Sequence, residues 1–252
     1  MTTDTVEVDF ITPRHLASGG DPAWITIPLH RACGWSHGND PLMPRVLLAS
    51  PDQAALLRLE PRPDRPWWTL RHAAAPDRPA WTATFGARTP VELIAAVTDA
   101  LTDPASTHDS SCDPYSSLRQ AGWTRYFDDG LVSFDNTSYI ERLAPPAETG
   151  AWAVTTIAVG TRDGGWSAYF GAHTPRHLVA AFTAGLASPE PLLRTDSGRT
   201  PNHSVRETRR VPAADVAGAL EDRIRSLASR YTAPAVVPVP SRHSPPKYGR
   251  SR

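Results

Sequence analysis

The strongest constraint on the fold of this chain is an internal repeat. The segment WTATFGARTP at 81–90 returns as WSAYFGAHTP at 166–175, so Trp81 corresponds to Trp166. Upstream, RACGW at 31–35 returns as RQAGW at 119–123, so Trp35 corresponds to Trp123. The offsets of these two motifs differ by only three residues, so both belong to one repeating unit with a small insertion. This period is too long for a solenoid, and each unit is expected to be a small domain.

Each unit is predicted to contain four strands followed by one helix. In the first unit, a short apolar run closed by a turn signal marks a strand at 44–50, and alternating apolar and polar residues mark strands at 54–60, 67–72 and 81–85. Thr89, Pro90 and Glu92 then fit a helix cap, a first helical turn and a capping box. The second copy follows the same order, with strands at 131–134, 139–143, 152–159 and 166–170 and a helix from 174 onward.

The fold class that follows is α+β, with two tandem β-β-β-β-α repeats in which one helix covers each antiparallel sheet. A helix covers only one face of a sheet, so the other face must meet its twin, a second chain or a ligand. The two sheets could pack on each other within the chain, or they could join edges and dimerise. Function is therefore expected on the uncovered faces.

The segments outside the repeats differ from them in charge. Residues 1–193 carry 14 basic and 21 acidic residues, whereas residues 194–252 carry 12 basic and 5 acidic ones, which is typical of a basic arm on a globular body. Near the end, an apolar stripe at helical spacing predicts an amphipathic helix. The predicted boundaries are an N-terminal arm 1–21, a first repeat 22–104, a linker 105–112, a second repeat 113–193, a basic linker 194–211, a helix 212–231 and a disordered Pro/Arg-rich tail 232–252.

Three local features together resemble one known family. They are ITPRHLASGGDP at 11–22, SPDQ at 50–53, and the repeated W-x-A-x-F-G-x-x-T-P ahead of a helix. Over residues 8–193 the chain is similar to the bacterial SPDY-motif family, a domain of unknown function that occurs in tandem copies. The resemblance implies a link to plasmid or mobile-element maintenance or transfer, because some members are connected with plasmid transfer and spread.

The SPDY motif itself is imperfect in this chain. Position 53 is Gln where the family has Tyr, and the second copy reads SFDNTSY at 133–139, with Phe134 in the place of the proline. We interpret the motif as turn chemistry, since Ser, Asp and Asn hydrogen-bond to their own backbone in turns. In fold alone, tandem β-β-β-β-α units are similar to PUR-type and Whirly-type modules, which bind single-stranded nucleic acid.

The sequence lacks the motifs of the common catalytic sites, and the chain is predicted not to be an enzyme. It has no G-x-S-x-G, no Walker-type loop, no H-E-x-x-H and no paired C-x-x-C, so a hydrolase or transferase is kept only as an alternative. His173 and His177, with Glu190 or Asp163 as a third ligand, are interpreted as a solvated pair at a helix start and not as a metal site. We expect no cofactor and no metal.

The outward side chains of the strands favour nucleic-acid binding, with DNA as the preferred ligand. Aromatic and arginine side chains on an open sheet are suited to base stacking and phosphate contact. The candidate binding residues are Arg58, Trp67, Arg71, Arg142 and Tyr169 on the sheets, and Arg206, Arg209 and Arg210 in the basic segment. The alternative is a protein-interaction module that self-associates through the same faces, as in a homodimer.

The expected location is the cytoplasm, with association with the nucleoid as one option. The segment MTTDTVEVDF at the start has neither the basic nor the apolar region of a secretory signal. No run of about 18 apolar residues is present to span a membrane. We therefore expect no membrane partner.

Overall fold

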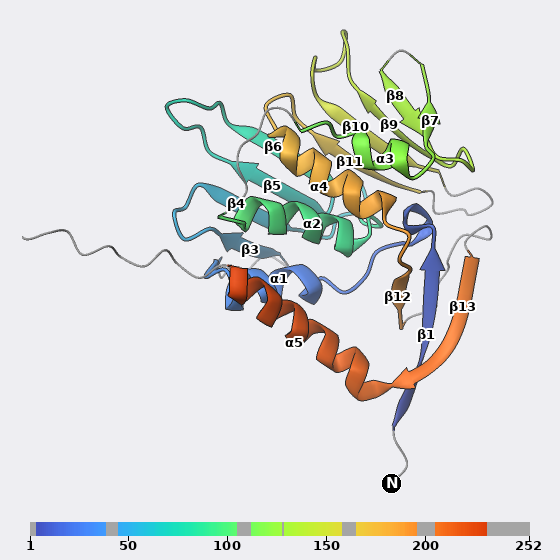
Figure 1. Cartoon of the computed structure of the whole chain (residues 1–252). Helices are drawn as coiled ribbons and strands as arrows, with labels where there is room; N and C mark the ends of the chain where they lie inside the picture. Colours follow the sequence, from blue (N-terminus) through green and yellow to red (C-terminus); the bar gives the residue numbers. More distant parts are fainter. Residues whose placement is uncertain are drawn as a thin grey trace, which may run out of the picture.

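A single antiparallel sheet of ten strands forms the body of the protein (Figure 1). The computed structural model describes residues 4–38, 45–104, 112–127, 129–157, 165–195 and 205–230. Helices cover one face of the large sheet, and three further strands form a second, smaller sheet. The predicted α+β class with tandem repeats is confirmed.

Both repeats contain the predicted four strands and helix, preceded by one more helix and one more short strand. The first repeat consists of α1 (Ala23–Arg31), β2 (Ser36–Gly38), β3 (Val46–Ala49), β4 (Ala55–Leu59), β5 (Trp68–His72), β6 (Trp81–Phe85) and α2 (Val91–Thr102). The second consists of α3 (Ser116–Gln120), β7 (Thr124–Arg125), β8 (Gly130–Val132), β9 (Ser138–Arg142), β10 (Trp152–Thr156), β11 (Trp166–Phe170) and α4 (Arg176–Ala187).

The repeated GW motif ends the first helix of each repeat. Gly34 and Gly122 adopt left-handed φ angles of 68° and 84°, which glycine reaches without a steric cost. After this turn the Trp123 N–H donates back to the Leu118 carbonyl at 3.0 Å. Trp35 and Trp123 are both buried. The motif therefore stops the helix and directs a tryptophan into the core.

The two repeats join through the edges of their sheets. The strand order is β2-β3-β4-β5-β6-β11-β10-β9-β8-β7, with β6 and β11 antiparallel at the centre. Two equivalent hydrogen bonds flank this seam, since Gly86 N–H donates to Ser167 O at 2.8 Å and Gly171 N–H donates to Thr82 O at 2.9 Å. Of the two arrangements considered for the sheets, edge joining is therefore the one adopted, and it occurs within one chain.

One hydrophobic core runs under both repeats. The inward side chains of the strands pack against α1, α2, α3 and α4. At the centre, the Phe85 ring lies 5.6 Å from the Phe170 ring and 6.0 Å from the Phe182 ring, measured between centroids. The helices α2 and α4 approach closely at Gly185, where a Cβ atom would lie 3.3 Å from Leu93. The two repeats therefore fold as one body.

The predicted N-terminal arm and basic linker differ from expectation, because both contain strands. The strand β1 (Thr5–Thr12) lies between β12 (Leu192–Arg194) and β13 (Val205–Pro212) in the three-stranded sheet. The charged sequence of β13 has no apolar alternation, and its partner β1 lies almost a whole chain away, so local periodicity gives no sign of the pairing. The one-turn helix η1 (Arg14–Leu16) follows β1.

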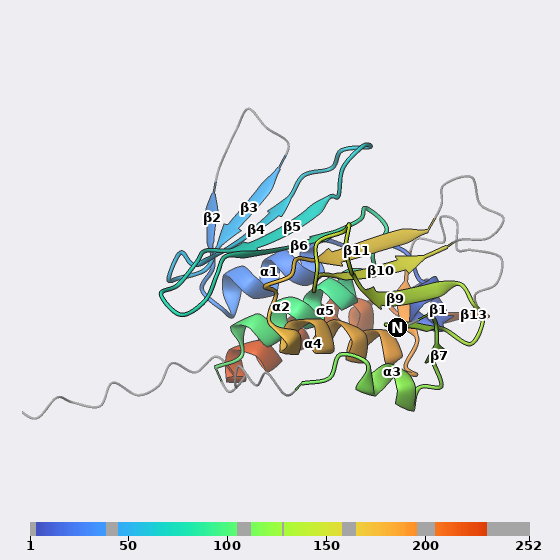
Figure 2. The same cartoon turned by 90° about the horizontal axis from the view of Figure 1, so that it is seen from above.

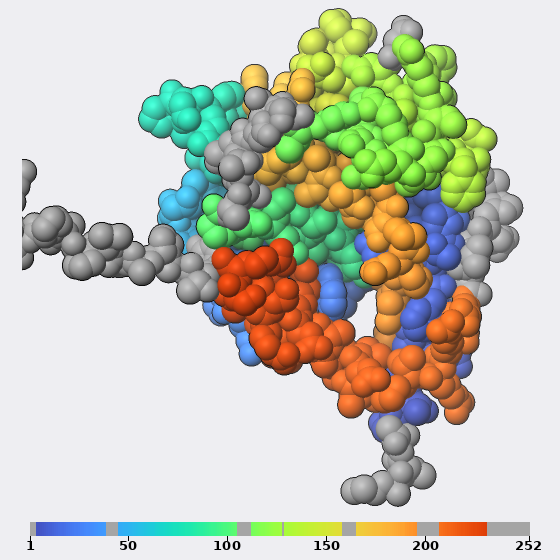
Figure 3. All heavy atoms as spheres, in the orientation of Figure 1, coloured from blue at the N-terminus to red at the C-terminus, as the bar shows by residue number. Residues whose placement is uncertain are grey.

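The predicted amphipathic helix is present as α5 (Ala213–Arg230). Its buried residues are Ile224 and Leu227, and it packs against α1. Figure 3 shows α5, in red, beside the green α2 on the helix-covered side of the molecule. The predicted tail, residues 232–252, lies outside the described residues.

Candidate nucleic-acid interface

The face of the ten-stranded sheet opposite the helices is uncovered in the described part of the chain (Figure 2). Alternation along each strand decides which side chains lie on this open face. In β6 the residues Trp81, Ala83 and Phe85 are buried, while Thr82 and Thr84 between them are half-buried on the other side. The open face is continuous across the seam because β6 and β11 are hydrogen-bonded neighbours.

Cross-strand pairing arranges the open-face residues in rows. The central row consists of Arg58, Thr69, Thr84, Tyr169, Ala153 and Glu141, each directly opposite the next. A second row consists of Leu56, Arg71 and Thr82, and a third of Ser167, Thr155, Tyr139 and Val132. Small hydroxyl side chains thus line the seam, arginines lie in the first repeat, and tyrosines lie on the side of the second.

The two open-face arginines differ in their surroundings. Arg58 lies 3.5 Å from the Glu60 carboxylate, and its guanidinium donates to Thr69 Oγ1 at 3.4 Å. Arg71 is exposed and forms no ion pair within the described residues. The charge of Arg58 is therefore partly balanced, whereas that of Arg71 faces solvent.

Tyr169 lies at the seam, with its phenol held by an acidic side chain. Its hydroxyl donates to the Glu148 carboxylate, which also accepts the Ala172 N–H at 2.9 Å. Burial and the neighbouring Glu148 raise the pKa of Tyr169 to about 12. The hydrogen bonds from Tyr169 and Ala172 lower the pKa of Glu148. The ring is thus a neutral, oriented aromatic surface.

Two predicted sheet residues do not lie free on the open face. Trp67 stands just before β5, packs against the core, and donates its indole N–H to the Arg62 carbonyl at 3.0 Å. Arg142 shares the face of Ile140, which is fully buried under the helices, because the two residues are two positions apart in β9. Strand alternation places Arg142 on the opposite side from Tyr169.

The basic segment lies in the smaller sheet. Arg206, Arg209 and Arg210 are on β13, opposite Ile11, Val8 and Glu7 of β1. Arg209 is ion-paired with Glu207 at 2.6 Å and lies over the Phe10 ring. The fold therefore separates these three arginines from the strands of the open face.

Sequence reasoning missed Tyr139 and Leu56, which strand alternation places on the open face.

The SPD segment and its counterpart form the same turn. In the first repeat, Ser50 Oγ donates to Asp52 at 2.5 Å and accepts the Ala55 N–H at 2.8 Å. In the second, Ser133 Oγ donates to Asp135 at 2.5 Å and accepts the Ser138 N–H at 3.0 Å. The prediction that the motif supplies turn chemistry agrees with this geometry.

The comparison with family models agrees with the geometry of the two turns. The model of the SPDY domain, described as a domain of unknown function (DUF317), matches residues 49–107 and 133–192. The protein carries two tandem SPDY domains. No curated protein and no solved structure matches the chain. The two matched segments start at the SPD and SFD turns and run past the ends of α2 and α4, so each SPDY match includes the helix that covers its sheet.

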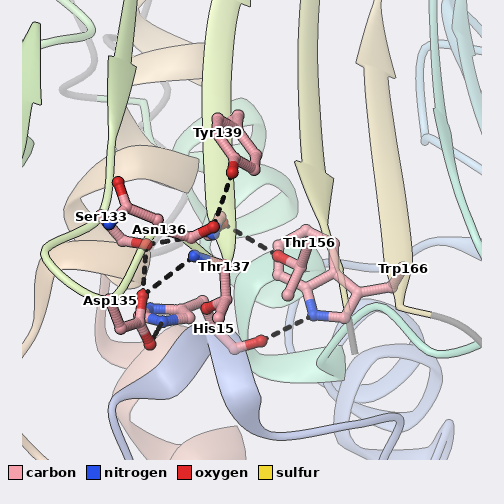
Figure 4. A network of polar contacts seen from close by, with 9 residues as sticks. His15, Ser133, Asp135, Asn136, Thr137, Tyr139, Thr156 and Trp166 are labelled. Carbon is pink, nitrogen blue, oxygen red and sulfur yellow. Dashed lines mark hydrogen bonds and ion pairs between the residues drawn. The ribbon is translucent and has the colours of Figure 1, made fainter. Parts of the chain in front are cut away.

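A buried polar cluster ties η1 to the second SPDY domain (Figure 4). His15 is buried, and its Nε2 lies 2.9 Å from Asp135 Oδ2, while its carbonyl accepts the Trp166 indole N–H at 3.0 Å. Burial lowers the pKa of His15, against the hydrogen bond and charge of Asp135. Ser133 and His15 both bind the same carboxylate, so the cluster links the SFD turn to the N-terminal segment.

The two histidines considered as metal ligands, His173 and His177, belong to no metal-binding cluster among the described residues. Among the described residues, no three His, Cys, Asp or Glu side chains gather to hold a metal ion; Asp163 lies outside that part of the chain. His173 lies near the charge of Glu148, and His177 lines a groove described below. No helix among the described residues is long and apolar enough to cross a bilayer.

Proposed function

We propose that this tandem SPDY protein binds nucleic acid, with DNA as the preferred ligand, across the open face of its ten-stranded sheet. The observation that carries the proposal is the placement of Arg58, Arg71 and Tyr169 on one uncovered surface. Guanidinium groups contact phosphates, and an aromatic ring offers a stacking surface to a base. A DNA-binding role in the cytoplasm, in the maintenance or transfer of a mobile element, is part of this proposal.

The open face is chemically asymmetric, and this gives the proposed complex a direction. Arg58 and Glu141 hold equivalent positions, since each lies two strands from the central pair along the same row. Likewise Leu56 in the first domain corresponds to Tyr139 in the second. We expect phosphate contacts over the first SPDY domain and stacking over the tyrosines of the second.

The test is a fluorescence-anisotropy titration of the full chain with labelled single-stranded and duplex oligonucleotides at two salt concentrations. Arg71→Ala should weaken binding to all sequences and reduce the salt slope by about 1. Tyr169→Ala should cost about 1–3 kcal/mol if a base stacks on the ring. Arg225→Ala, on the exposed surface of α5, is the matched control and should leave the affinity unchanged. Absence of binding at low salt would refute the proposal.

A protein-interaction role is the second candidate, and one observation favours it. Leu56 is 39% exposed on the open face, beside Arg71, where an apolar side chain gains from burial against a partner. Sedimentation of the full chain and of Leu56→Lys separates the two functions. Self-association that Leu56→Lys abolishes, without nucleic-acid binding, would favour the interaction module.

A further inference from the structure

A groove lies on the helix-covered side of the molecule, away from the open face, between the end of α2 and the start of α4. Its volume is about 210 Å³. Its lining combines apolar and polar side chains from both SPDY domains, and it includes the Trp81 ring stacked on His72 at 5.5 Å. The repeat relates α2 to α4, so the same location exists a second time, between the end of α4 and the start of α2.

At that second location the chain fills the space with its own N-terminal segment, residues 14–19. Arg14 donates to the Gly185 carbonyl at 3.2 Å, near the end of α4. The His15 carbonyl accepts the Trp166 indole N–H at 3.0 Å. Gly19 then forms a pair of backbone hydrogen bonds at the start of α2. A short peptide thus bridges the two helices and the tryptophan of the last strand.

The Gly19 pair fixes the end of that peptide. The Gly19 N–H donates to Arg88 O at 2.8 Å, and the Gly19 carbonyl accepts the Val91 N–H at 3.0 Å. The counterparts of these two groups in the second repeat are His173 O and Arg176 N–H. In the described part of the chain neither of them takes part in a hydrogen bond.

The other two contacts also have unused counterparts in the groove. Trp81 corresponds to Trp166, and its indole N–H has no acceptor among the described residues. Ala100 corresponds to Gly185. In a helix each of these carbonyls would accept the N–H of the residue four positions later, but those residues are Pro104 and Pro189, and a proline has no N–H to donate. Arg14 uses the carbonyl that the proline leaves open at Gly185, whereas the described residues offer no donor to Ala100.

We propose that this groove docks a segment of a partner polypeptide that carries an arginine and, five residues later, a glycine. The arginine donates to the Ala100 carbonyl, a backbone carbonyl of the segment accepts the Trp81 indole N–H, and the glycine pairs with His173 O and Arg176 N–H. These four contacts are among those that residues 14–19 make at the equivalent location, where Arg14 also donates to the Glu190 carbonyl at 2.7 Å.

The charges around the groove favour this orientation of the segment. The last turn of α2 contains no basic residue, and Asp103 follows it, so the arginine would lie at the negative end of a helix beside a carboxylate. Arg78, the other charged residue of the lining, is paired with Asp77 at 3.3 Å.

The experiment uses the synthetic peptide TPRHLASGG, the sequence of residues 12–20, labelled and titrated into the full chain. We expect saturable binding, and the peptide with alanine in place of arginine should bind about tenfold more weakly. Trp81→Phe keeps an aromatic ring and removes the indole N–H, and it should weaken binding about three- to tenfold. Ala100→Leu is the second variant, for use if Trp81→Phe proves unstable. It fills the groove from a half-exposed position and should also weaken peptide binding.

Arg71→Ala is the matched control, because Arg71 lies on the open face and its loss should affect only nucleic-acid binding. A photo-cross-linker in place of leucine in the peptide should label residues 100–104 and 175–178. Labelling around Trp166 and Gly185 would mean that the peptide displaces the chain's own segment, and this would overturn the proposal. Absence of saturable binding to the full chain would overturn it too.

Discussion

Tyr169 pairs with Thr84 across the seam, and the offset that relates Trp81 to Trp166 makes these two residues the same position in the two repeats. A residue that pairs with its own counterpart lies on the two-fold axis of an isologous contact. The seam therefore has the geometry of a symmetric dimer interface inside one chain. This explains why WTATFGARTP and WSAYFGAHTP are the most similar stretches: each faces the other.

The backbones approach closely at two equivalent glycines of the seam. A Cβ atom at Gly171 would lie 3.1 Å from Thr82 O, and one at Gly86 would lie 3.3 Å from Ser167 O. We expect Gly171→Val to lower the free energy of unfolding by about 1–3 kcal/mol, because the strands would have to separate. Urea unfolding monitored by tryptophan fluorescence measures the change.

Gly218→Ala is the control for the seam prediction. Gly218 lies inside α5, where an added Cβ meets nothing within 4 Å. This substitution should raise stability by about 0.5–1 kcal/mol, because alanine favours the helix. An equal loss of stability in both variants would refute the role of the seam.

A half-buried ion pair joins α5 to α2. The two terminal guanidinium nitrogens of Arg223, Nη1 and Nη2, donate to Asp99 of α2 at 2.9 and 2.7 Å, and its Nε donates to the Trp24 carbonyl at 2.9 Å. Arg223→Ala leaves Asp99 without its cation, and we expect a loss of about 3 kcal/mol. Hydrogen exchange in α5 should rise together with this loss.

The neighbouring Arg225 offers a matched control for this effect. It pairs with Asp222 within the same helix, and both side chains are exposed. Arg225→Ala should change stability by less than about 0.5 kcal/mol. If the two arginine variants unfolded alike, the ion pair would not be what holds α5.

Local sequence patterns predicted the repeats well, because strand alternation and helix periodicity depend on neighbours in the chain. The predicted capping box at Thr89 and Glu92 is wrong: α2 starts after Pro90 without a side-chain cap, and the Thr89 hydroxyl donates to the Ser167 carbonyl of the other repeat at 3.1 Å. Thr84 and Tyr169 were correctly placed outward for this reason. The same alternation places Arg142 on the side of buried Ile140, so its assignment to the open face could have been avoided. The pairing of β1 with β13, and the burial of His15 against Asp135, join segments far apart in the chain. Patterns among neighbouring residues therefore could not predict these two contacts.

The phenol of Tyr169 should titrate at a higher pH than an ordinary tyrosine. Burial, and the hydrogen bond to the charged Glu148, raise its pKa to about 12 from an ordinary value near 10. The stability that this gives is present below pH about 10 and is lost as the pH rises through about 12. The ultraviolet difference between wild type and Tyr169→Phe reports the titration. Glu148→Gln removes the charge and should move the titration toward lower pH; an unchanged curve would refute the contact.

The buried imidazole of His15 should make stability fall in mild acid. Burial lowers its pKa, so as the pH drops below the ordinary histidine value of about 6.5 the unfolded chain takes up a proton that the folded chain refuses. Burial opposes the charge of Asp135, but the hydrogen bonds from Ser133 and His15 prevail and bring its pKa to about 2, so a second loss of stability follows between pH about 4 and about 2.

His15→Gln keeps a donor for Asp135 and cannot titrate, and the stability of this variant should therefore be flat between pH about 7 and about 5. His37→Gln, at an exposed position, should retain the wild-type slope. Urea midpoints across this range decide the matter, because equal slopes in wild type and His15→Gln would mean that some other group causes the acid loss.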